Sequence, residues 1–295
     1  MLCPRPRTGR VVLALLFAVL RGACACTPSP PFDSAAAEPD ASAGLEPPVA
    51  LIASAPAPPP APCPAEMALI GDFCIDRYEA HIVDSSAPDL PLPHSERPRA
   101  GVTYAARSRA GVKPQGYLSR IEAARACSED GKRLCAAREW YGACRGSQQT
   151  RFPYGDKEVR KRRNTRKDHV MSVLFGVHTR YMYDAHYNNP RLALAPGFLA
   201  ATGEYDGCVN DYGLFDMVGN LHEWIADDVT PALAEEVPIE YGRWGLGHDG
   251  SGAFMGGYYS SRSEHGRGCA YITATHAPDY HDYSIGFRCC RDAPR

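Results

Sequence analysis

Twelve cysteines and ten histidines are the residues of this 295-residue chain whose types are best suited to chemistry. Thiolates and imidazoles bind transition metals, and two thiols in an oxidising compartment form a disulfide instead. Nine cysteines lie beyond the N-terminal region, at Cys63, Cys74, Cys127, Cys135, Cys144, Cys208, Cys269, Cys289 and Cys290. Because nine is odd, at least one of them is expected to stay free or to pair outside its domain.

The N-terminus has the pattern of an export signal. Arg5, Arg7 and Arg10 precede an apolar run of ten residues at 11–20, which is too short to span a bilayer. Small residues and two cysteines follow at 22–26, the pattern of a lipoprotein processing site. The sequence therefore predicts a signal peptide over residues 1–25 and lipidation of Cys26, with cleavage and no lipid as the alternative. A lipid anchor would hold the protein on a membrane of the cell envelope, on the periplasmic or cell-surface side.

Composition divides the rest of the chain into a tether and one large domain. Residues 26–64 are rich in Pro and Ala and cannot bury enough apolar surface to fold, so they are expected to form a semi-extended tether. The folded domain is expected over residues 65–292. A net charge of -2 gives no reason to expect a nucleic-acid partner. The basic run at 157–167 lacks interleaved aromatic residues, so it is interpreted as a solvated loop. Export makes the nine cysteines disulfide candidates first and metal ligands second.

Few segments of the domain have a regular hydrophobic period. Short strands are expected at 67–70 and 73–75. Ser119 and Glu122 have the spacing of a capping box, which predicts a helix ended by Gly131, with Ile121, Ala124 and Cys127 on one face. A second helix is expected over 137–144, with Trp140 buried. The expected fold class is α+β with little regular secondary structure, and a domain of this kind needs disulfides for stability.

Four segments occur in an order typical of one family. They are GKRL, REW and CRG within 131–146, FPYGD at 152–156, YGLFDMVGNLHEW at 212–224, and MGG at 255–257 followed by IGFRC at 285–289. Together they resemble the sulfatase-modifying-factor family, named for the formylglycine-generating enzyme. This resemblance implies a formylglycine-generating-enzyme-like, C-type-lectin-like fold stapled by disulfides. The segment FCIDRYE at 73–79 resembles an exported bacterial branch of the family.

The resemblance also implies two disulfides and a metal site. The disulfides would join Cys127 to Cys289 and Cys144 to Cys269, which leaves five cysteines unassigned. Structural calcium would bind the side chains of Asp216 and Glu223 and the carbonyl oxygens of Gly219 and Leu221, the hard ligands that calcium prefers. The alternative is that both carboxylates only accept hydrogen bonds from loop amides.

The resemblance fails at the family's catalytic centre. The enzyme holds copper(I) on two cysteines, soft ligands for a soft ion, and the matching positions here are Ser261 and Gly266. The stretch 256–268 contains no cysteine. We therefore expect neither the family's oxidase activity nor bound copper.

The remaining residues predict a binding or assembly module for a peptide or protein ligand. Its candidate pocket would be lined by His222, Tyr258, Tyr259 and His265, and Tyr271, Tyr280 and Tyr283 could extend the groove. The alternative is a metal-dependent oxidoreductase of the formylglycine-generating or non-heme iron type, since His222, His265, His276 and His281 all lie in segments that line the family's pocket. Each histidine could equally be a hydrogen-bonded loop residue, and iron is not expected.

Overall fold

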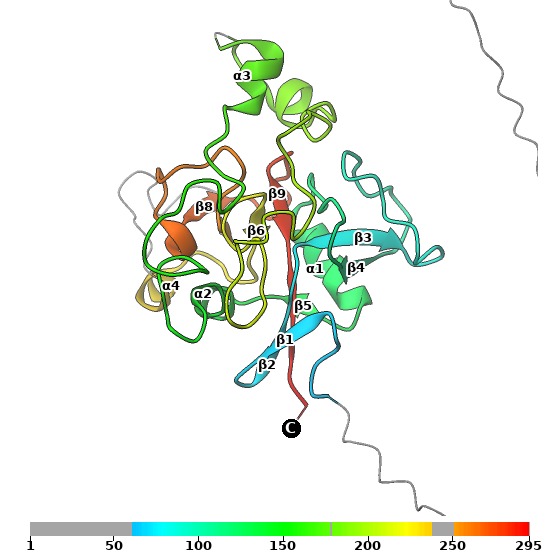
Figure 1. The fold of residues 1–295 in the computed structure, drawn as a ribbon. Helices are drawn as coiled ribbons and strands as arrows, with labels where there is room; N and C mark the ends of the chain where they lie inside the picture. Colours follow the sequence, from blue (N-terminus) through cyan, green and yellow to red (C-terminus); the bar gives the residue numbers. More distant parts are fainter. Residues whose placement is uncertain (1–60, 178, 238–250, 295) are drawn as a thin grey trace, which may run out of the picture. The chain divides into compact units, whose positions relative to one another are not determined.

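The computed structural model describes residues 61–177, 179–237 and 251–294 (Figure 1). The predicted signal peptide, the predicted lipidation site Cys26 and the tether as far as residue 60 lie outside the described residues. The described residues all belong to one compact unit. Among the described residues, no helix has the length and the hydropathy that crossing a bilayer requires.

A four-stranded sheet joins the start of the domain to its end. Strands β1 (Met67–Ile70) and β2 (Phe73–Asp76) form a hairpin whose turn contains Gly71 at a φ of 58°. β2 pairs antiparallel with β10 (Cys289–Asp292), and β10 pairs with β5 (Arg133–Leu134). The N-terminal hairpin is therefore closed by the last strand of the chain, as Figure 1 shows.

Two further sheets lie beside it. Strands β3 (Ala80–Asp84) and β4 (Tyr104–Ser108) form an antiparallel pair. The third sheet has the order β8 (Ile272–His276), β7 (Gly252–Met255), β6 (His222–Trp224), β9 (Ile285–Phe287). Only β6 and β9 are parallel in it. With the helices described below, these short strands give the domain the expected α+β class.

Helix α1 (Arg120–Glu129) begins and ends as predicted but buries a different face. The Ser119 hydroxyl accepts from the Glu122 amide, the Glu122 side chain accepts from the Ser119 amide, and Gly131 follows the helix at a φ of 64°. Its buried residues are Ala123, Ala126 and Cys127, whereas Ile121 is 52% exposed and Ala124 is exposed. The predicted face is thus wrong at two of three positions. Ala123, Ala126 and Cys127 lie in one hydrophobic cluster with Tyr104 and Ala106 of β4, so the face with small residues, and not the face with Ile121, packs against the strand.

Helix α2 (Ala137–Arg145) covers the predicted range and buries Trp140 completely. Ala136, at the N-terminus of α2, has no polar side chain that could cap the helix. Instead, the Asp227 carboxylate, 90 residues away, accepts from the Ala137 amide at 2.5 Å. Glu139 accepts from the Ala136 amide at 2.8 Å. A carboxylate supplied by the tertiary structure therefore satisfies the first turn of the helix.

The other helices are short and serve as connections. They are α3 (Val170–Phe175), the π-helix η1 (Tyr183–Tyr187), α4 (Pro231–Glu236) and the 3-10 helix η2 (Gly268–Ala270).

Four disulfides join segments that are distant in the sequence. The structure contains Cys127–Cys289 and Cys144–Cys269, the two pairs that the resemblance implies. It also pairs Cys135 with Cys290, and Cys63 with Cys74. Cys63 belongs to the predicted tether. The disulfide cross-links of the domain therefore begin two residues before its predicted start at residue 65. Cys208 is free and buried among the described residues. Such a set of disulfides is typical of an extracytoplasmic protein.

Candidate functional site

The loop from residue 256 to residue 271 connects β7 to β8 and carries both positions matched to the family's cysteines. It begins with a turn in which Gly256 and Gly257 have φ angles of 86° and 74°. A Cβ at residue 256 would lie 2.7 Å from the carbonyl oxygen of Met217 and 3.1 Å from the Trp140 ring. Only glycine allows the loop to pass this close to α2.

Ser261 is committed to hydrogen bonds within the loop. Its hydroxyl accepts from the Tyr258 amide at 2.9 Å and donates to the Tyr271 hydroxyl at 3.2 Å. Tyr271 in turn donates to Glu264 at 3.1 Å. Ser261 is only 2% exposed, so its hydroxyl lies inside the loop and takes part in this chain of hydroxyls.

Gly266 has no room for a side chain. Its φ is 112°, a region that L residues rarely adopt, and a Cβ would overlap the carbonyl oxygen of Ala270. The nearest cysteine in the loop, Cys269, is bonded to Cys144. Burial raises the pKa of the Cys208 thiol to about 12, so this free thiol is protonated and unreactive.

His222 is buried in a ring of aromatic side chains. Its imidazole packs against Phe254 at 4.8 Å, Tyr258 at 5.1 Å and Tyr271 at 5.7 Å between ring centroids. Burial lowers its pKa well below the usual value, so the ring is neutral, and its Nδ1 has no hydrogen-bond partner.

Two of the other predicted histidines contact rings of this group, and the third, His281, lies elsewhere. His265 packs on Tyr271, and His276 packs on Phe254. His281 contacts Asn188 Oδ1 through Nδ1 at 2.6 Å. Within the residues that the structure describes, no group of three or more His, Cys, Asp or Glu side chains could hold a metal ion.

The tyrosines expected in a groove are largely core residues. Tyr259 and Tyr283 are 1% and 3% exposed and belong to a hydrophobic cluster with Val170 and Leu192. Tyr258 is partly buried and packs edge-on against Tyr259 at 5.1 Å. The structure thus places Tyr259 inside the domain, because the turn at residues 256–257 directs the following residues inward.

Two of the four residues predicted to bind calcium, Asp216 and Glu223, lie with Glu79 near a buried arginine, Arg288. We call these four side chains the charged centre. The other two predicted residues, Gly219 and Leu221, are buried in the segment between Asp216 and Glu223. Arg288 Nε and Nη2 donate to the two oxygens of Glu223 at 2.7 and 2.8 Å, and Trp140 donates to the same carboxylate at 2.6 Å. Asp216 Oδ2 accepts from the Gly203 amide at 2.7 Å. Three donors already contact the Glu223 carboxylate and would compete with a calcium ion for it. Calcium binding at Asp216 and Glu223 stays a prediction.

Burial in the charged centre raises the pKa values of two carboxyl groups, Asp216 and Glu79. The pKa of Asp216 is raised to about 7, chiefly by burial and in part by the nearby Glu223, against the opposing effects of the Gly203 amide and Arg288. Burial and the charges of Asp216 and Glu223 raise the pKa of Glu79 well above its usual value. Glu79 nevertheless accepts from the Asn220 side chain and the Leu221 amide. One cation is thus shared among three carboxyl groups.

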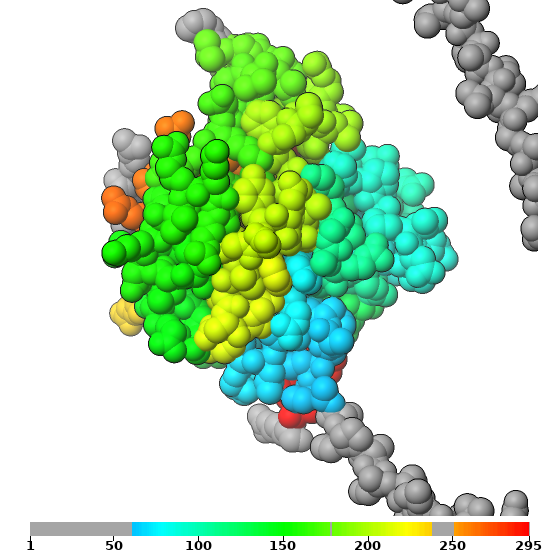
Figure 2. Space-filling model, in the orientation of Figure 1, coloured from blue at the N-terminus to red at the C-terminus, as the bar shows by residue number. Residues whose placement is uncertain are grey.

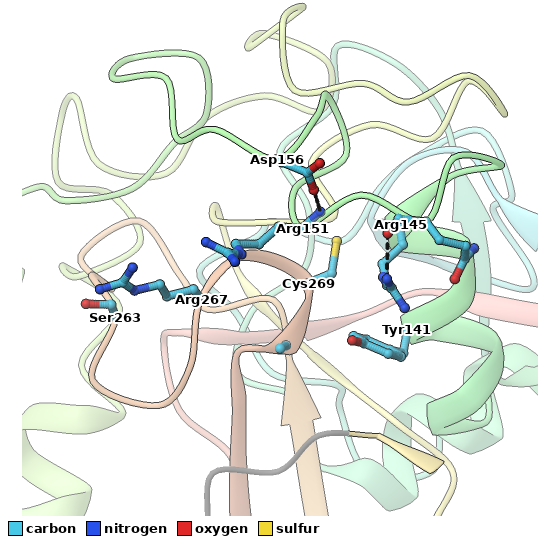
Figure 3. Close-up of a pocket in the computed structure, with 9 residues that line it drawn as sticks. Tyr141, Arg145, Arg151, Asp156, Ser263, Arg267 and Cys269 are labelled. Atoms are coloured by element: carbon cyan, nitrogen blue, oxygen red, sulfur yellow. Dashed lines mark hydrogen bonds between the residues drawn. The ribbon is translucent and has the colours of Figure 1, made fainter.

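An open pocket lies on the other side of the loop, against α2 (Figure 3). We call it the arginine pocket, because Arg145, Arg151 and Arg267 line its cavity of about 620 Å³ together with Tyr141 and the Cys144–Cys269 disulfide. Figure 3 shows the side chains of Arg151 and Arg267 on the same side of the pocket. Asp156 accepts only from the backbone amide of Arg151. No acidic partner of the Arg151 or Arg267 guanidinium occurs among the described residues.

Sequence reasoning missed this pocket. Its three arginines come from α2, from the segment after it, and from the loop, so no local spacing brings them together. Arg145 is part of the CRG motif, and its Nη2 donates to Gln149 O while its guanidinium lies 5.1 Å from the Tyr141 ring. The implied Cys144–Cys269 disulfide was the one available signal, because these cysteines lie close in sequence to Arg145 and Arg267.

A family model described as "Sulfatase-modifying factor enzyme 1-like domain" matches residues 90–293, more than half of the chain. The chain belongs to this sulfatase-modifying-factor family. The fold, the motif order and the disulfides agree with that assignment.

Two curated relatives from Bos taurus have contrasting names. The chain is 28% identical over 181 residues to the formylglycine-generating enzyme, covering 61% of this chain and 44% of the relative. It is 27% identical over 183 residues to inactive C-alpha-formylglycine-generating enzyme 2, covering 62% of this chain and 51% of the relative. The chain thus spans about half the length of either relative. Among solved structures, PvdO from Pseudomonas aeruginosa is similar, with 16% identity, a TM-score of 0.41 and coverage of 75% of this chain and 80% of that one.

Proposed function

We propose that this chain is an extracytoplasmic binding or assembly module that does not perform the oxidase reaction of the formylglycine-generating enzyme. The loop at residues 256–271 carries this proposal. Ser261 is used in the loop's own hydrogen bonds, and a side chain at Gly266 would overlap Ala270. Copper(I) requires soft ligands such as thiolates, and this loop conformation offers no place for a pair of them.

The N-terminal pattern supports attachment to a membrane. A signal peptide over residues 1–25, a lipid on Cys26 and a tether over 26–64 would hold the domain away from the membrane surface. The four disulfides support the same compartment, because they persist where the environment is oxidising.

The ligand we propose is a peptide or protein segment rich in carboxylates, bound in the arginine pocket. Guanidinium groups bind carboxylates through two parallel hydrogen bonds. The guanidiniums of Arg151 and Arg267 lack acidic partners in the described part of the domain, and Tyr141 adds an aromatic wall. This site replaces Tyr258 and Tyr259 as the expected contact surface, because Tyr259 is buried.

A binding titration tests the proposal. A fluorescein-labelled peptide of alternating Glu and Gly should raise its anisotropy on adding the full chain, whereas the matching Lys-Gly peptide should not. The double variant Arg151→Gln/Arg267→Gln should weaken binding at least tenfold, since each charge-assisted hydrogen bond contributes roughly 1.5–3 kcal/mol.

A matched control separates the pocket from general attraction. Arg138→Gln/Arg180→Gln removes the same charge from two exposed arginines outside the pocket and should leave binding within about twofold. Equal weakening by both double variants would reject the pocket. Oxidation of a cysteine-containing sulfatase peptide by the copper-loaded chain would reject the non-oxidase proposal itself.

One observation favours a metal-dependent oxidoreductase as the second candidate. The buried Nδ1 of His222 has no hydrogen-bond partner, and His265 and His276 lie on rings that His222 also contacts. Elemental analysis of the protein purified from an oxidising compartment decides between the candidates. Stoichiometric iron, copper or zinc that is lost in His222→Phe would favour this second function.

A further inference from the structure

The basic run at residues 157–167 forms a second pocket, separate from the arginine pocket. Its cavity has a volume of about 500 Å³. Five cationic side chains line it, and Glu158 is its one acidic lining residue. The five are Arg160, Lys161, Arg163, Arg166 and Lys167. A cavity walled by cations differs from the solvated loop expected from the sequence.

Hydrogen bonds to a neighbouring segment hold this run in place. Arg162 Nε donates to Gly207 O at 2.7 Å. Lys167 Nζ donates to Gly197 O and Phe198 O at 2.6 and 2.7 Å. Figure 2 shows the green part of the chain, which includes the run, packed beside the yellow segment that follows residue 200. The pocket therefore has a fixed wall.

The positive charge in this pocket is only partly compensated. Arg163 and Arg166 both donate to the Glu158 carboxylate, at 2.8 and 2.7 Å. Glu204 acts on Lys167 and Glu264 acts on Arg166 from outside the lining, so five cations face three carboxylates and an excess of positive charge remains. Arg160 and Lys161 are exposed, and neither has an acidic partner within the described residues. Like charges held this close repel each other and favour binding of an anion.

Two groups in the pocket have surroundings that favour an anionic ligand. Arg163 is 4% exposed, yet its buried Nε has no hydrogen-bond partner. Burial lowers the pKa of Lys167 to about 8, and the nearby Lys113 lowers it too, against the opposing effect of Glu204. A negatively charged ligand in the pocket would lie close to Arg163 and would raise the pKa of Lys167 again.

We propose that this pocket binds a phosphate group. The tetrahedral oxygens of a phosphate accept several charge-assisted hydrogen bonds at once, and arginine with lysine is the donor set that recognises it. Thr165 also lines the pocket and offers a hydroxyl donor. The cavity accommodates either free phosphate or the phosphate of a lipid headgroup. The site shares no lining residue with the arginine pocket, so it is independent of the proposed function.

Two substitutions within the same run test the site. Lys161→Gln removes a charge that lines the pocket, whereas Lys157→Gln removes one that does not. Both side chains are exposed, so both variants should fold. Isothermal titration of the full chain with inorganic phosphate should show saturable binding that Lys161→Gln weakens about fivefold or more. Lys157→Gln should change it less than twofold.

Vesicles distinguish the source of the phosphate. Flotation of the full chain with phosphatidylglycerol vesicles, compared with phosphatidylcholine vesicles, measures attachment to an anionic headgroup. Attachment that Lys161→Gln reduces and Lys157→Gln does not would assign the site to a lipid headgroup, and titration by inorganic phosphate alone would assign it to a free ligand. The proposal is rejected if neither probe binds, or if the two variants lose binding equally.

Discussion

Arginine side chains occur in both the charged centre and the arginine pocket, but their surroundings differ. Arg288 is completely buried, and its donors contact Glu223 and the carbonyl oxygens of Asp76 and Phe215. Arg151 and Arg267 are exposed, and their guanidiniums have no acidic partner within the described residues. A buried charge must be paired to be tolerated, whereas an exposed one is free to bind a ligand. The comparison assigns stability to one region and recognition to the other.

The largest expected effect is on the charged centre. Arg288→Met would leave Glu223 buried without its cation, which costs roughly 3–5 kcal/mol. We expect the variant to lose most of its folded population in urea titrations followed by fluorescence. Arg151→Met should change the free energy of unfolding by no more than about 0.5 kcal/mol. An Arg288→Met protein as stable as the wild type would show that its pair contributes little, and the comparison would fail.

The next effect compares a disulfide beside each region. Replacing both Cys135 and Cys290, or both Cys144 and Cys269, opens a loop of 155 or 125 residues. Either double Ala variant should lose roughly 2–4 kcal/mol, the typical contribution of a disulfide. Thermal unfolding measures both losses.

Only one of these disulfides borders the arginine pocket. Loss of Cys144–Cys269 should therefore weaken capture of the Glu-Gly peptide at temperatures where the variant is still folded, and loss of Cys135–Cys290 should not. Equal capture by both variants would mean that the pocket does not depend on its disulfide.

Asp216 gives a pH-dependent effect within the charged centre. Its pKa is about 7 in the folded protein, compared with an ordinary 3.8, so the folded state binds the proton more tightly. This contribution to stability is complete below about pH 4 and is lost as the pH rises to about 7. Asp216→Asn should remove the loss, because Asn is also tolerated at a φ of 58° and can accept from Gly203.

Chemical unfolding at pH 5 and pH 8 measures this difference. The stability of Asp216→Asn relative to the wild type should rise by roughly 2–3 kcal/mol between the two values. The same experiment tests the calcium prediction. If calcium binds through Asp216, 5 mM calcium should stabilise the wild type at pH 8 and not the variant. Stabilisation of neither by calcium would leave the carboxyl proton as the explanation.

Local signals in the sequence explain why some features were predictable. The capping box at Ser119 and the two short strands at 67–70 and 73–75 depend on residues close together in the sequence, and both occur as expected. Motif order predicted the fold and two disulfides, because the spacing spans the whole domain. Ile121 shows the limit of such reasoning, since apolar size alone cannot say which face of a helix will meet a sheet.

The candidate site was harder to predict because its determinants are tertiary. The loss of the cysteine pair was visible at Ser261 and Gly266, but the fit of Gly266 against Ala270 was not. Similarly, Glu223 was expected near an ion, and its partner Arg288 lies 65 residues away. The residues of the arginine pocket have no common spacing at all. The sequence therefore did not show which charged residues, far apart in the chain, pair with each other in the fold.

The smallest expected effect concerns His222, which is buried without charge or a partner for Nδ1. Replacing it with Phe removes a buried polar atom that lacks a hydrogen bond, while the ring can still pack on Phe254 and Tyr258. We expect His222→Phe to stabilise the domain by about 1 kcal/mol at pH 7. His281→Phe is the control, because it removes an existing contact with Asn188 and should destabilise by a similar amount.

The pH dependence sharpens this test of His222. Because burial lowers the pKa of His222 in the folded state, its neutral form contributes stability above the ordinary pKa near 6.5, and the contribution is lost as the pH falls below that value. His222→Phe should therefore be less sensitive to acid than the wild type. A wild type that gains stability from added zinc or iron, when His222→Phe does not, would instead make His222 a ligand. That outcome would place the functional site at the buried His222 and not at the open arginine pocket.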